Sequence, residues 1–586
     1  MAAASPESPA QKRKSASPAG KTGSGTMTCG GALLSRLKAL GIDYIFANSG
    51  TDFPPIIEGL AEAAASGIDL PESLVIPHES AAMGMAHGYY LATGKTAAVM
   101  AHTNVGLANC SIGAINAATE HIPVLLFSGR TPTTEKDRFG SRTVPIGWGQ
   151  EMRDQTALVR EASKWDYELR FPEQAVETAD RAKAIAETAP RGPVYVSLPR
   201  EVLCEPTGTE QLDLPPIMRP ARPGLSEADF ETAAKWLAEA ENPVIFAQHG
   251  AGGPDGFAAL GELAEKWGIP VCQYWAVQCA IDSDHPMAAA APPAPLLEKA
   301  DVILVIDCLA PWAPDAHGPR PGAKVIHLAQ DPLFSRVPVR NFQCDLALAA
   351  DVEPGLLALK KKLAAFTPSE REEARRKFWA DTNAGTRKKA ITSAKAGERD
   401  PMTKSWVSLC LSEALAGRDA SVLSELGCPM DAMSLTHAQA WFQEPHSGGL
   451  GWSFPAALGM KIGAPERTIV ATMGDGSYIF SNPVACHQIA EAHRLPILLV
   501  ILNNAEWGAV RQSVLGLYPD GHAARSNQVP LTGLSPVPDF AMIARASRAH
   551  AQRVEHGADL PGAIEAALKH IDDQGTMVLL DVQVAP

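Results

Sequence analysis

The chain of 586 residues lacks several features that would assign it to particular classes of protein. No apolar run reaches the roughly 18 residues that span a membrane, so no transmembrane helix is expected. The ten cysteines show neither CxxC pairs nor metal-ligand spacing, which favours reduced thiols and a cytoplasmic location. Positive charge is scarce, with 51 Lys and Arg against 65 Asp and Glu. The net charge of −14 argues against a nucleic-acid partner.

The pattern of strands and helices after residue 26 predicts an α/β protein. The chain is too long for one hydrophobic core and suggests about three domains. These domains are expected at residues 27–204, 224–365 and 401–586, with a Pro-rich linker at 205–223. Residues 1–26 are rich in Ala, Ser, Pro, Gly and Lys and contain no apolar signal core. They are expected to form a disordered tail.

The most specific pattern lies near the C-terminus. The apolar run 467–473 predicts a buried strand that ends at Gly474-Asp475-Gly476-Ser477. A helix is expected from Pro483 to His493, and the apolar strand 496–502 then ends at Asn503-Asn504. Two parallel strands joined by a helix place both polar clusters at the same carboxyl edge of the sheet. Open α/β sheets bind their ligands at that edge.

The residue types at this edge suit a diphosphate held through Mg²⁺. Asp475 offers an anionic oxygen and Asn504 a neutral one, and Mg²⁺ takes oxygen ligands from carboxylates, phosphates and water. Backbone amides and the Ser477 hydroxyl at the helix start are able to hold phosphate oxygens. A Gly-Asp-Gly sequence alone is more often an ordinary turn. The flanking strands, the helix and the Asn pair therefore carry the functional interpretation.

A second candidate site lies near the N-terminus. The strand 73–77 leads into His78-Glu79-Ser80 and then into a helical run over residues 81–92. Glu79 thus lies where a strand ends and a helix begins. A glutamate at a helix start also gains roughly a few tenths of a kcal/mol from the helix dipole, so this position alone does not identify a function.

Together these segments resemble the thiamine-diphosphate-dependent enzymes of the acetolactate synthase, pyruvate decarboxylase and benzoylformate decarboxylase group. The resemblance implies three doubly wound parallel-sheet domains, namely pyrimidine-binding, central and diphosphate-binding. It implies thiamine diphosphate and Mg²⁺ as cofactors, with Asp475, Asn504 and the backbone carbonyl of Glu506 as metal ligands. It also makes Glu79 the catalytic glutamate that activates the cofactor through its pyrimidine ring. The residues that the resemblance assigns to cofactor binding are Glu79, Leu450, Gly474, Asp475, Gly476, Ser477 and Asn504.

His102 is the second catalytic candidate. It follows the strand 96–100, where acetolactate synthases typically carry a Gly-Pro-Gly loop. A histidine there resembles benzoylformate decarboxylase, in which it relays protons, and imidazole donates and accepts protons near neutral pH. A structural histidine bonded to a loop carbonyl remains an alternative. A second catalytic histidine is not identified, and His78, His249 and His317 are weak candidates for it.

Four further positions relate to the substrate. Thr51 lies where benzoylformate decarboxylase carries a serine near the substrate carboxylate. By resemblance, Trp507 and Val510 line the substrate cavity together with Thr51 and His102, although Trp507 equally suits packing at a domain interface. Arg142, in the Gly-rich loop 140–150, suits either a carboxylate clamp or a surface salt bridge.

The resemblance implies an enzyme that cleaves or forms a C–C bond next to a carbonyl, by decarboxylation of a small 2-oxo acid, by carboligation, or by both. It also implies a homodimer or homotetramer with the cofactor at the subunit interface. The donor and acceptor substrates stay open, and the central domain shows no convincing flavin signature. The alternative is a catalytically silent homologue that binds the cofactor for structure or regulation. Such a homologue is expected to have lost Glu79 or the metal ligands.

Overall fold

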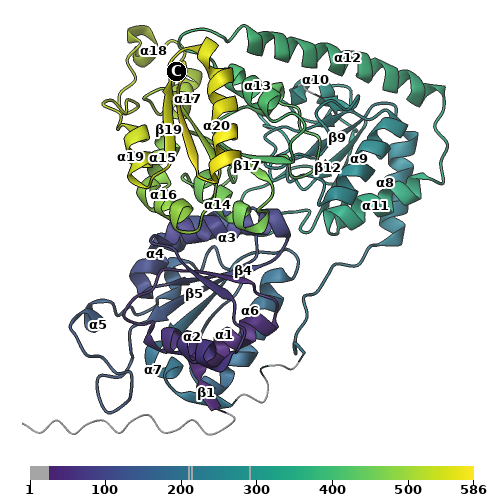
Figure 1. Ribbon diagram of the computed structural model, residues 1–586. Helices are drawn as coiled ribbons and strands as arrows, with labels where there is room; N and C mark the ends of the chain where they lie inside the picture. The colour runs from purple at the N-terminus through teal and green to yellow at the C-terminus, as the bar shows by residue number, and fades with distance from the viewer. Residues whose placement is uncertain (1–25, 209–211, 213–214, 290–291) are drawn as a thin grey trace, which may run out of the picture.

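Apolar, β-branched runs form the centres of three parallel sheets, each of six strands (Figure 1). The computed structural model describes residues 26–208, 212, 215–289 and 292–586. The expected tail at 1–26 therefore lies, apart from Thr26, outside the described residues. The fold class expected from the sequence, three α/β domains with parallel sheets, is confirmed. No helix within the described residues has both the length and the apolar character that crossing a membrane requires.

Domain one has the strand order β3-β2-β4-β5-β7-β6, with every pair parallel. Helices α1, α2 and α6 cover one face of this sheet, and α3 and α4 cover the other. The strands are β2 (Tyr44–Ala47), β3 (Glu72–Val75), β4 (Ala97–Ala101), β5 (Val124–Arg130), β6 (Asp166–Glu168) and β7 (Val194–Pro199). The helices are α1 (Cys29–Ala39), α2 (Pro54–Ser66), α3 (Glu79–Thr93), α4 (Thr103–Thr119), α5 (Ile146–Gly149), α6 (Ala175–Glu187) and α7 (Arg200–Leu203).

Domain two has the order β11-β10-β9-β12-β13-β14, which is the 3-2-1-4-5-6 order of dinucleotide-binding sheets. Its strands are β9 (Pro243–Ala247), β10 (Val271–Cys272), β11 (Ala288–Ala289), β12 (Val302–Ile306), β13 (Lys324–Ala329) and β14 (Leu346–Ala349). Its helices are α8 (Glu227–Glu239), α9 (Pro254–Trp267), α10 (Pro293–Leu297) and α11 (Val352–Leu363). The long helix α12 (Glu370–Lys395) then leads to domain three, along the upper edge in Figure 1.

Domain three has the order β16-β15-β17-β18-β20-β19. Counted from the first strand of each sheet, this is the order of domain one, so the two domains share one topology. Its strands are β15 (Ala420–Glu425), β16 (Trp441–Gln443), β17 (Thr468–Gly474), β18 (Leu498–Asn503), β19 (His550–Val554) and β20 (Val578–Gln583). Its helices are α13 (Lys404–Ala414), α14 (Ser453–Gly463), α15 (Asp475–Phe480), α16 (Pro483–Ala492), α17 (Gly508–Leu517), α18 (His522–Ser526), α19 (Phe540–Ala546) and α20 (Leu560–Gln574).

Two segments differ in detail from the sequence-based expectation. The Pro-rich stretch after domain one begins with strand β8 (Pro206–Gly208), which pairs antiparallel with β1 (Thr26–Thr28) and ties the two ends of that domain together. The expected helix from Pro483 is present as α16, but the short helix α15 precedes it. The two helices are separated because Asn482 is left-handed, with φ of 55°, and Pro483 begins a new helix.

Domains one and three meet through α3 and α14, which lie against each other in Figure 1. Small residues bring the two backbones close. A Cβ on Gly88 would lie 1.8 Å from the carbonyl oxygen of Ala456, and one on Gly459 would lie 1.9 Å from that of Met85. One hydrophobic cluster therefore runs from Val99 in the first sheet, through both helices, to Leu499 in the third. The contact between these domains is a shared core.

A methyl group at Gly88 tests this contact. We expect Gly88→Ala to lower the free energy of unfolding by about 1–3 kcal/mol or more, because the two helices must separate to admit it. Gly385→Ala is the matched control, since it lies in the exposed interior of α12 and a Cβ there meets nothing within 4 Å. The control is expected to be neutral or slightly stabilising. Equal effects of the two substitutions in denaturant unfolding would contradict the shared core.

Candidate active site

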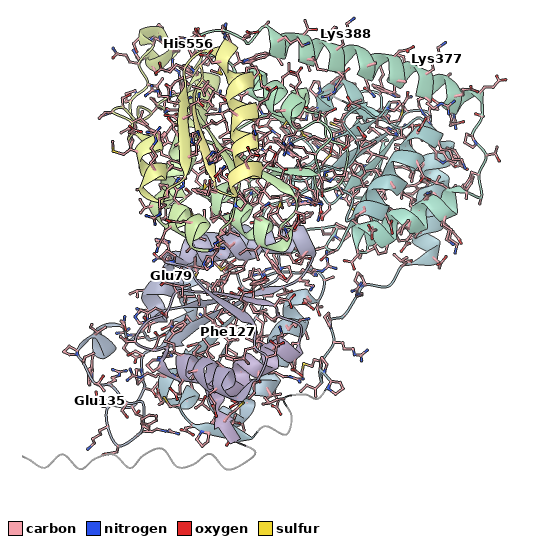
Figure 2. The ribbon with its side chains drawn as sticks, viewed as in Figure 1. Glu79, Phe127, Glu135, Lys377, Lys388 and His556 are labelled. Carbon is pink, nitrogen blue, oxygen red and sulfur yellow. The ribbon has the colours of Figure 1, made fainter. Side chains whose placement is uncertain are left out.

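Glu79 is the first residue of α3 and lies where domain one borders domain three (Figure 2). Its carboxylate is buried and held on both oxygens. The side-chain amide of Asn48 donates to Oε1 at 2.9 Å, and that of Asn109 donates to Oε2 at 3.0 Å. A Cβ on Gly106 would lie 2.7 Å from Oε1, so the first turn of α4 also approaches the carboxylate closely. Glu79 is therefore fixed by β2, α3 and α4 together.

His102 lies at the N-terminus of α4 between two polar side chains. Its Nδ1 hydrogen-bonds Oδ1 of the buried Asp52, and its Nε2 lies 3.0 Å from the side-chain nitrogen of Gln150. A carboxylate only accepts, so Nδ1 carries the hydrogen and Nε2 accepts from Gln150. The hydrogen bond to Asp52 raises the pKa of His102 above its usual value. The ring lies so close to Gly50 that a Cβ there would be 2.1 Å from Nδ1.

The backbone beside His102 is strained. Thr103 has φ of 36°, which a β-branched residue rarely adopts, and its hydroxyl is buried without a hydrogen-bond partner. Strain of this kind persists where the surrounding structure holds it, and it concentrates at functional sites. Thr51 is exposed nearby, and its carbonyl accepts a hydrogen bond from Arg200 at 3.2 Å.

Arg142 is engaged within its own loop. Its guanidinium donates to Glu151 and to the carbonyl of Pro132, and it lies 5.4 Å from the ring centre of Trp148. This pairing corresponds to the salt-bridge alternative more than to a free carboxylate clamp. The loop instead reaches His102 through Gln150.

The second cluster lies at the carboxyl ends of β17 and β18, which are neighbours in the sheet. Oδ1 of Asp475 accepts the backbone N–H of Gly476 at 2.9 Å, whereas Oδ2 is buried without a partner. Burial raises the pKa of Asp475, and the backbone N–H groups of Gly476, Ala505 and Glu506 oppose that rise. The Asp475 carboxylate therefore faces the loop after β18 with one oxygen unsatisfied.

The two asparagines after β18 have different environments. Asn503 is buried and donates to Asp581 at 2.9 Å, which ties β18 to β20. Asn504 is only partly buried, and its Oδ1 accepts the backbone N–H of Glu506 at 3.2 Å. Ala505, between Asn504 and Glu506, is left-handed, with φ of 58°. The carbonyl of Glu506 accepts from Gly508 and has a second lone pair.

Trp507 packs over this cluster. A Cβ on Gly476 would lie 2.3 Å from its ring, and its ring stacks edge-on against Phe480 at 5.7 Å. Close packing thus requires glycine at position 476. Val510, on α17, is 47% exposed.

Leu450 lies on a loop whose backbone is hydrogen-bonded to the side chain of Glu425. This fully buried carboxylate accepts the backbone N–H of Gly451 at 2.6 Å and that of Ser453 at 2.7 Å. Burial raises the pKa of Glu425. Burial and the charge of Glu425 together raise that of Glu444 to about 7. A cavity of about 180 Å³ is lined by Leu450 and by Asn109, the same residue that donates to Glu79.

The structure thus forms two clusters, one around Glu79 and His102 and one around Asp475 and Asn504. Within the described residues, no hydrogen bond or ion pair joins them directly, and the Leu450 loop lies between domains one and three. Sequence reasoning missed Asp52, Asn109, Gln150 and Glu425. Of these four residues, only Glu425 had an unusual sequence position, because it is a charged residue at the end of an apolar strand.

Profiles of the thiamine pyrophosphate enzymes match this chain in three segments. They are the N-terminal TPP binding domain over residues 27–158, the central domain over 230–359 and the C-terminal TPP binding domain over 426–582. The chain belongs to the thiamine pyrophosphate enzyme family. The resemblance inferred from the Gly-Asp-Gly and Asn-Asn segments is confirmed, and the chain carries TPP-binding domains.

Several proteins resemble the chain over nearly its whole length. A probable acetolactate synthase large subunit of Methanocaldococcus jannaschii is 26% identical, over 95% of this chain and 91% of its own. A benzoylformate decarboxylase of Pseudomonas aeruginosa is 28% identical, over 91% and 95%. A sulfoacetaldehyde acetyltransferase of Alcaligenes xylosoxydans xylosoxydans is 26% identical, over 95% and 93%.

A solved structure shares the fold. The thiamine diphosphate-dependent 4-hydroxybenzoylformate decarboxylase of Rhodococcus jostii RHA1 superposes with a TM-score of 0.74. The superposition covers 95% of this chain and 99% of that one, at 22% identity. At this identity the likeness extends to the fold alone.

The pairing of His102 with Asp52 predicts a pH dependence. Because the folded-state pKa of His102 is raised, the stabilisation by this pair is fully present below the unfolded value of about 6.5 and is lost as pH rises through the folded value. We expect Asp52→Asn to lower the pKa of His102, measured by NMR titration of its ring protons. The exposed Asp137→Asn is the matched control and is expected to leave this pKa unchanged. A His102 pKa that is the same in all three proteins would contradict the pairing.

Proposed function

We propose that this chain is a thiamine-diphosphate- and Mg²⁺-dependent enzyme that cleaves or forms a C–C bond next to the carbonyl of a small 2-oxo acid. The observation that carries the proposal is the convergence of Asp475 with the Asn504–Glu506 loop. One carboxylate oxygen there is buried without a partner, as a cation ligand would be. Burying an ionised group is costly unless a partner or a metal compensates for it.

In this proposal Asp475, Asn504 and the carbonyl of Glu506 hold Mg²⁺, and the ion holds the diphosphate. The oxygen donors suit Mg²⁺, which takes its remaining ligands from phosphate and water. Gly474 is the N-cap of α15, and Gly476 and Ser477 lie in its first turn, where backbone N–H groups are able to hold phosphate oxygens. Asn503 suits a structural role, because its side-chain nitrogen donates to Asp581 and its Oδ1 accepts the backbone N–H of Ala505.

Glu79 is proposed to bind the pyrimidine ring, and Leu450 would pack against the cofactor. The amides of Asn48 and Asn109 orient the carboxylate, and burial keeps competing water away. Once bound, thiamine diphosphate supplies the carbon nucleophile and the electron sink. The chain's own contribution is to orient the ring, hold the metal and move protons.

His102 is the proposed proton-transfer group. Asp52 fixes its ring and leaves Nε2, which now accepts from Gln150, as the nitrogen able to exchange a proton with a substrate. A histidine in this position favours decarboxylation, while the acetolactate synthase relative supports carboligation by the same site. Thr51, Trp507 and Val510 are proposed to line the substrate cavity with His102.

A homo-oligomer is part of the proposal. Apolar side chains are exposed near both clusters. This is expected where a second copy of the chain covers the surface. They are Val105, Ile112 and Ile115 on α4, together with Phe480 and Val484. The silent-homologue alternative is disfavoured, because Glu79, Asp475 and Asn504 are all present with the geometry described above.

The experiment that tests the function offers a panel of 2-oxo acids to the purified protein with thiamine diphosphate and Mg²⁺. We expect CO₂ release, with an aldehyde as product if decarboxylation dominates and a hydroxyketone if carboligation does. Asp475→Asn is expected to abolish turnover and to reduce cofactor retention after dialysis against a chelator. If the wild-type protein binds the cofactor fully but turns over none of the 2-oxo acids, the result would instead support the structural or regulatory alternative.

Glu79→Gln separates cofactor activation from cofactor binding. We expect the variant to retain thiamine diphosphate, because the metal site is unchanged. Hydrogen–deuterium exchange at the thiazolium carbon is expected to slow by at least about 10²-fold, because general acid–base catalysis contributes at least that factor. Exchange is measured by acid quench and NMR. The exposed Glu58→Gln on α2 is the control and is expected to exchange normally. Wild-type exchange in Glu79→Gln would remove Glu79 from this role.

A further inference from the structure

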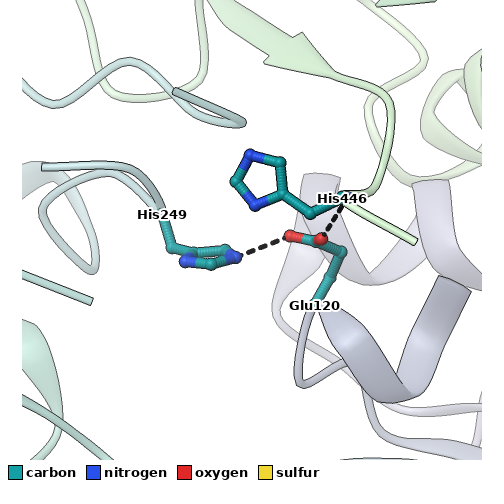
Figure 3. A group of neighbouring side chains, drawn as sticks. All are labelled: Glu120, His249 and His446. Carbon is teal, nitrogen blue, oxygen red and sulfur yellow. Dashed lines mark hydrogen bonds and ion pairs between the residues drawn. The ribbon is translucent and has the colours of Figure 1, made fainter. Parts of the chain in front are cut away.

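Three side chains from three domains meet away from the site described above (Figure 3). Glu120 follows α4 in domain one, His249 follows β9 in domain two, and His446 follows β16 in domain three. Their donor atoms all lie within 4.8 Å of one another. Nε2 of His249 is 2.8 Å from Oε2 of Glu120, and the backbone N–H of His446 donates to Oε1 at 2.9 Å. The Glu120 and His249 side chains are only 7% and 10% exposed.

Backbone carbonyls set the hydrogen positions on both imidazole rings. Nδ1 of His249 lies 2.5 Å from the carbonyl oxygen of Asp307, and Nε2 of His446 lies 2.8 Å from that of Trp275. A carbonyl only accepts, so these two nitrogens carry hydrogens. The opposite nitrogens, Nε2 of His249 and Nδ1 of His446, are directed at the Glu120 carboxylate (Figure 3). This arrangement is typical of metal ligands, whose second ring nitrogen donates to a carbonyl or carboxylate.

The cluster also contains an unsatisfied group. Nδ1 of His446 is buried and has no hydrogen-bond partner. Two ring nitrogens and a carboxylate thus converge in a partly buried position, and a positive charge between them would stabilise this arrangement.

We propose that Glu120, His249 and His446 bind a divalent transition metal of the zinc class. Zinc binds histidine nitrogen and glutamate oxygen at about 2.0–2.2 Å, so neighbouring ligand atoms lie about 3.4 Å apart in a tetrahedral site. The three donor atoms lie within 4.8 Å of one another, which is close to that separation. Two imidazoles favour zinc over Mg²⁺, which prefers oxygen ligands. A cavity of about 300 Å³ adjoins the cluster and leaves room for water as the fourth ligand.

The proposed metal is distinct from the Mg²⁺ at Asp475 and has a different role. It joins the three domains at one point, and it fixes the residue four positions before Leu450. Binding displaces any proton from the ring nitrogens to solvent, and no electron is transferred.

A proton is the competitor for the same position. Burial opposes a charge on His249, but the adjacent Glu120 and Asp307 raise its pKa to about 10. A His249–Glu120 ion pair without metal therefore accounts for part of the cluster, although it leaves Nδ1 of His446 without a partner.

Zinc titration of the full-length holoenzyme tests the site. After chelator treatment and reloading with thiamine diphosphate and Mg²⁺, Zn²⁺ is titrated against a chromophoric competitor. We expect one tight equivalent. His446→Ala and Glu120→Gln are each expected to weaken it by more than the roughly 100-fold that loss of a supporting hydrogen bond costs. His121→Ala, which removes a histidine lining the same cavity, and Asp475→Asn are the controls and are expected to retain it.

The opposite results would overturn the proposal. They are Zn²⁺ binding equally tightly to wild type and His446→Ala, or binding lost in Asp475→Asn but kept in His446→Ala. Co²⁺ substitution of the unmodified protein gives a second measurement that needs no variant. A visible spectrum from nitrogen and oxygen ligands is expected. No such spectrum at one equivalent, or one with thiolate charge transfer from the cysteines, would reject the site.

Discussion

The close packing of α3 against α14 is the constraint on which the rest of the molecule depends. Glu79 is the first residue of α3, and the Leu450 loop runs directly into α14. Gly84 packs on Pro455 and Gly463 packs on Thr93, so the two helices run in the same general direction. Their N-terminal ends therefore lie together. The glycines that let the backbones touch thus also set how Glu79 and Leu450 are placed relative to each other.

The repeated topology of domains one and three explains why two unlike clusters occupy equivalent positions. In each sheet the order in which strands are added reverses between two neighbouring strands, β2 and β4 in one domain and β15 and β17 in the other. Ligands of open α/β sheets bind at such a reversal. Asp52 and His102 follow β2 and β4 in domain one, whereas in domain three Glu425 ends β15 and Asp475 follows β17. Domain two has a different strand order, and the proposed cofactor residues lie outside it.

The sequence predicted features that depend on local pattern and missed those that depend on distant contacts. Strands β9 and β12 lie where their apolar runs predicted, because buried parallel strands are continuous apolar segments. Asp475 and Asn504 were proposed as ligands because each directly follows such a strand. Asp52 was not, because its partner His102 is 50 residues away and only the folded sheet brings them together. The shared topology of the outer domains was equally hidden, since strand order leaves no repeat in the residues themselves.

Helix α4 shows how few residues connect these parts. Asn109, Asn116 and Glu120 are spaced by seven and four positions, so they lie on one face of the helix. Asn109 holds Glu79, Asn116 donates to the carbonyl of Gly449 at 2.9 Å and accepts from Ser447, and Glu120 accepts from His446. One rigid element thus contacts the Glu79 carboxylate at one end and the loop that carries Leu450 along the rest of its length. A shift of α4 by one turn would break all three contacts at once, and therefore the relative placement of Glu79 and Leu450 depends on the register of this helix more than on the loop itself.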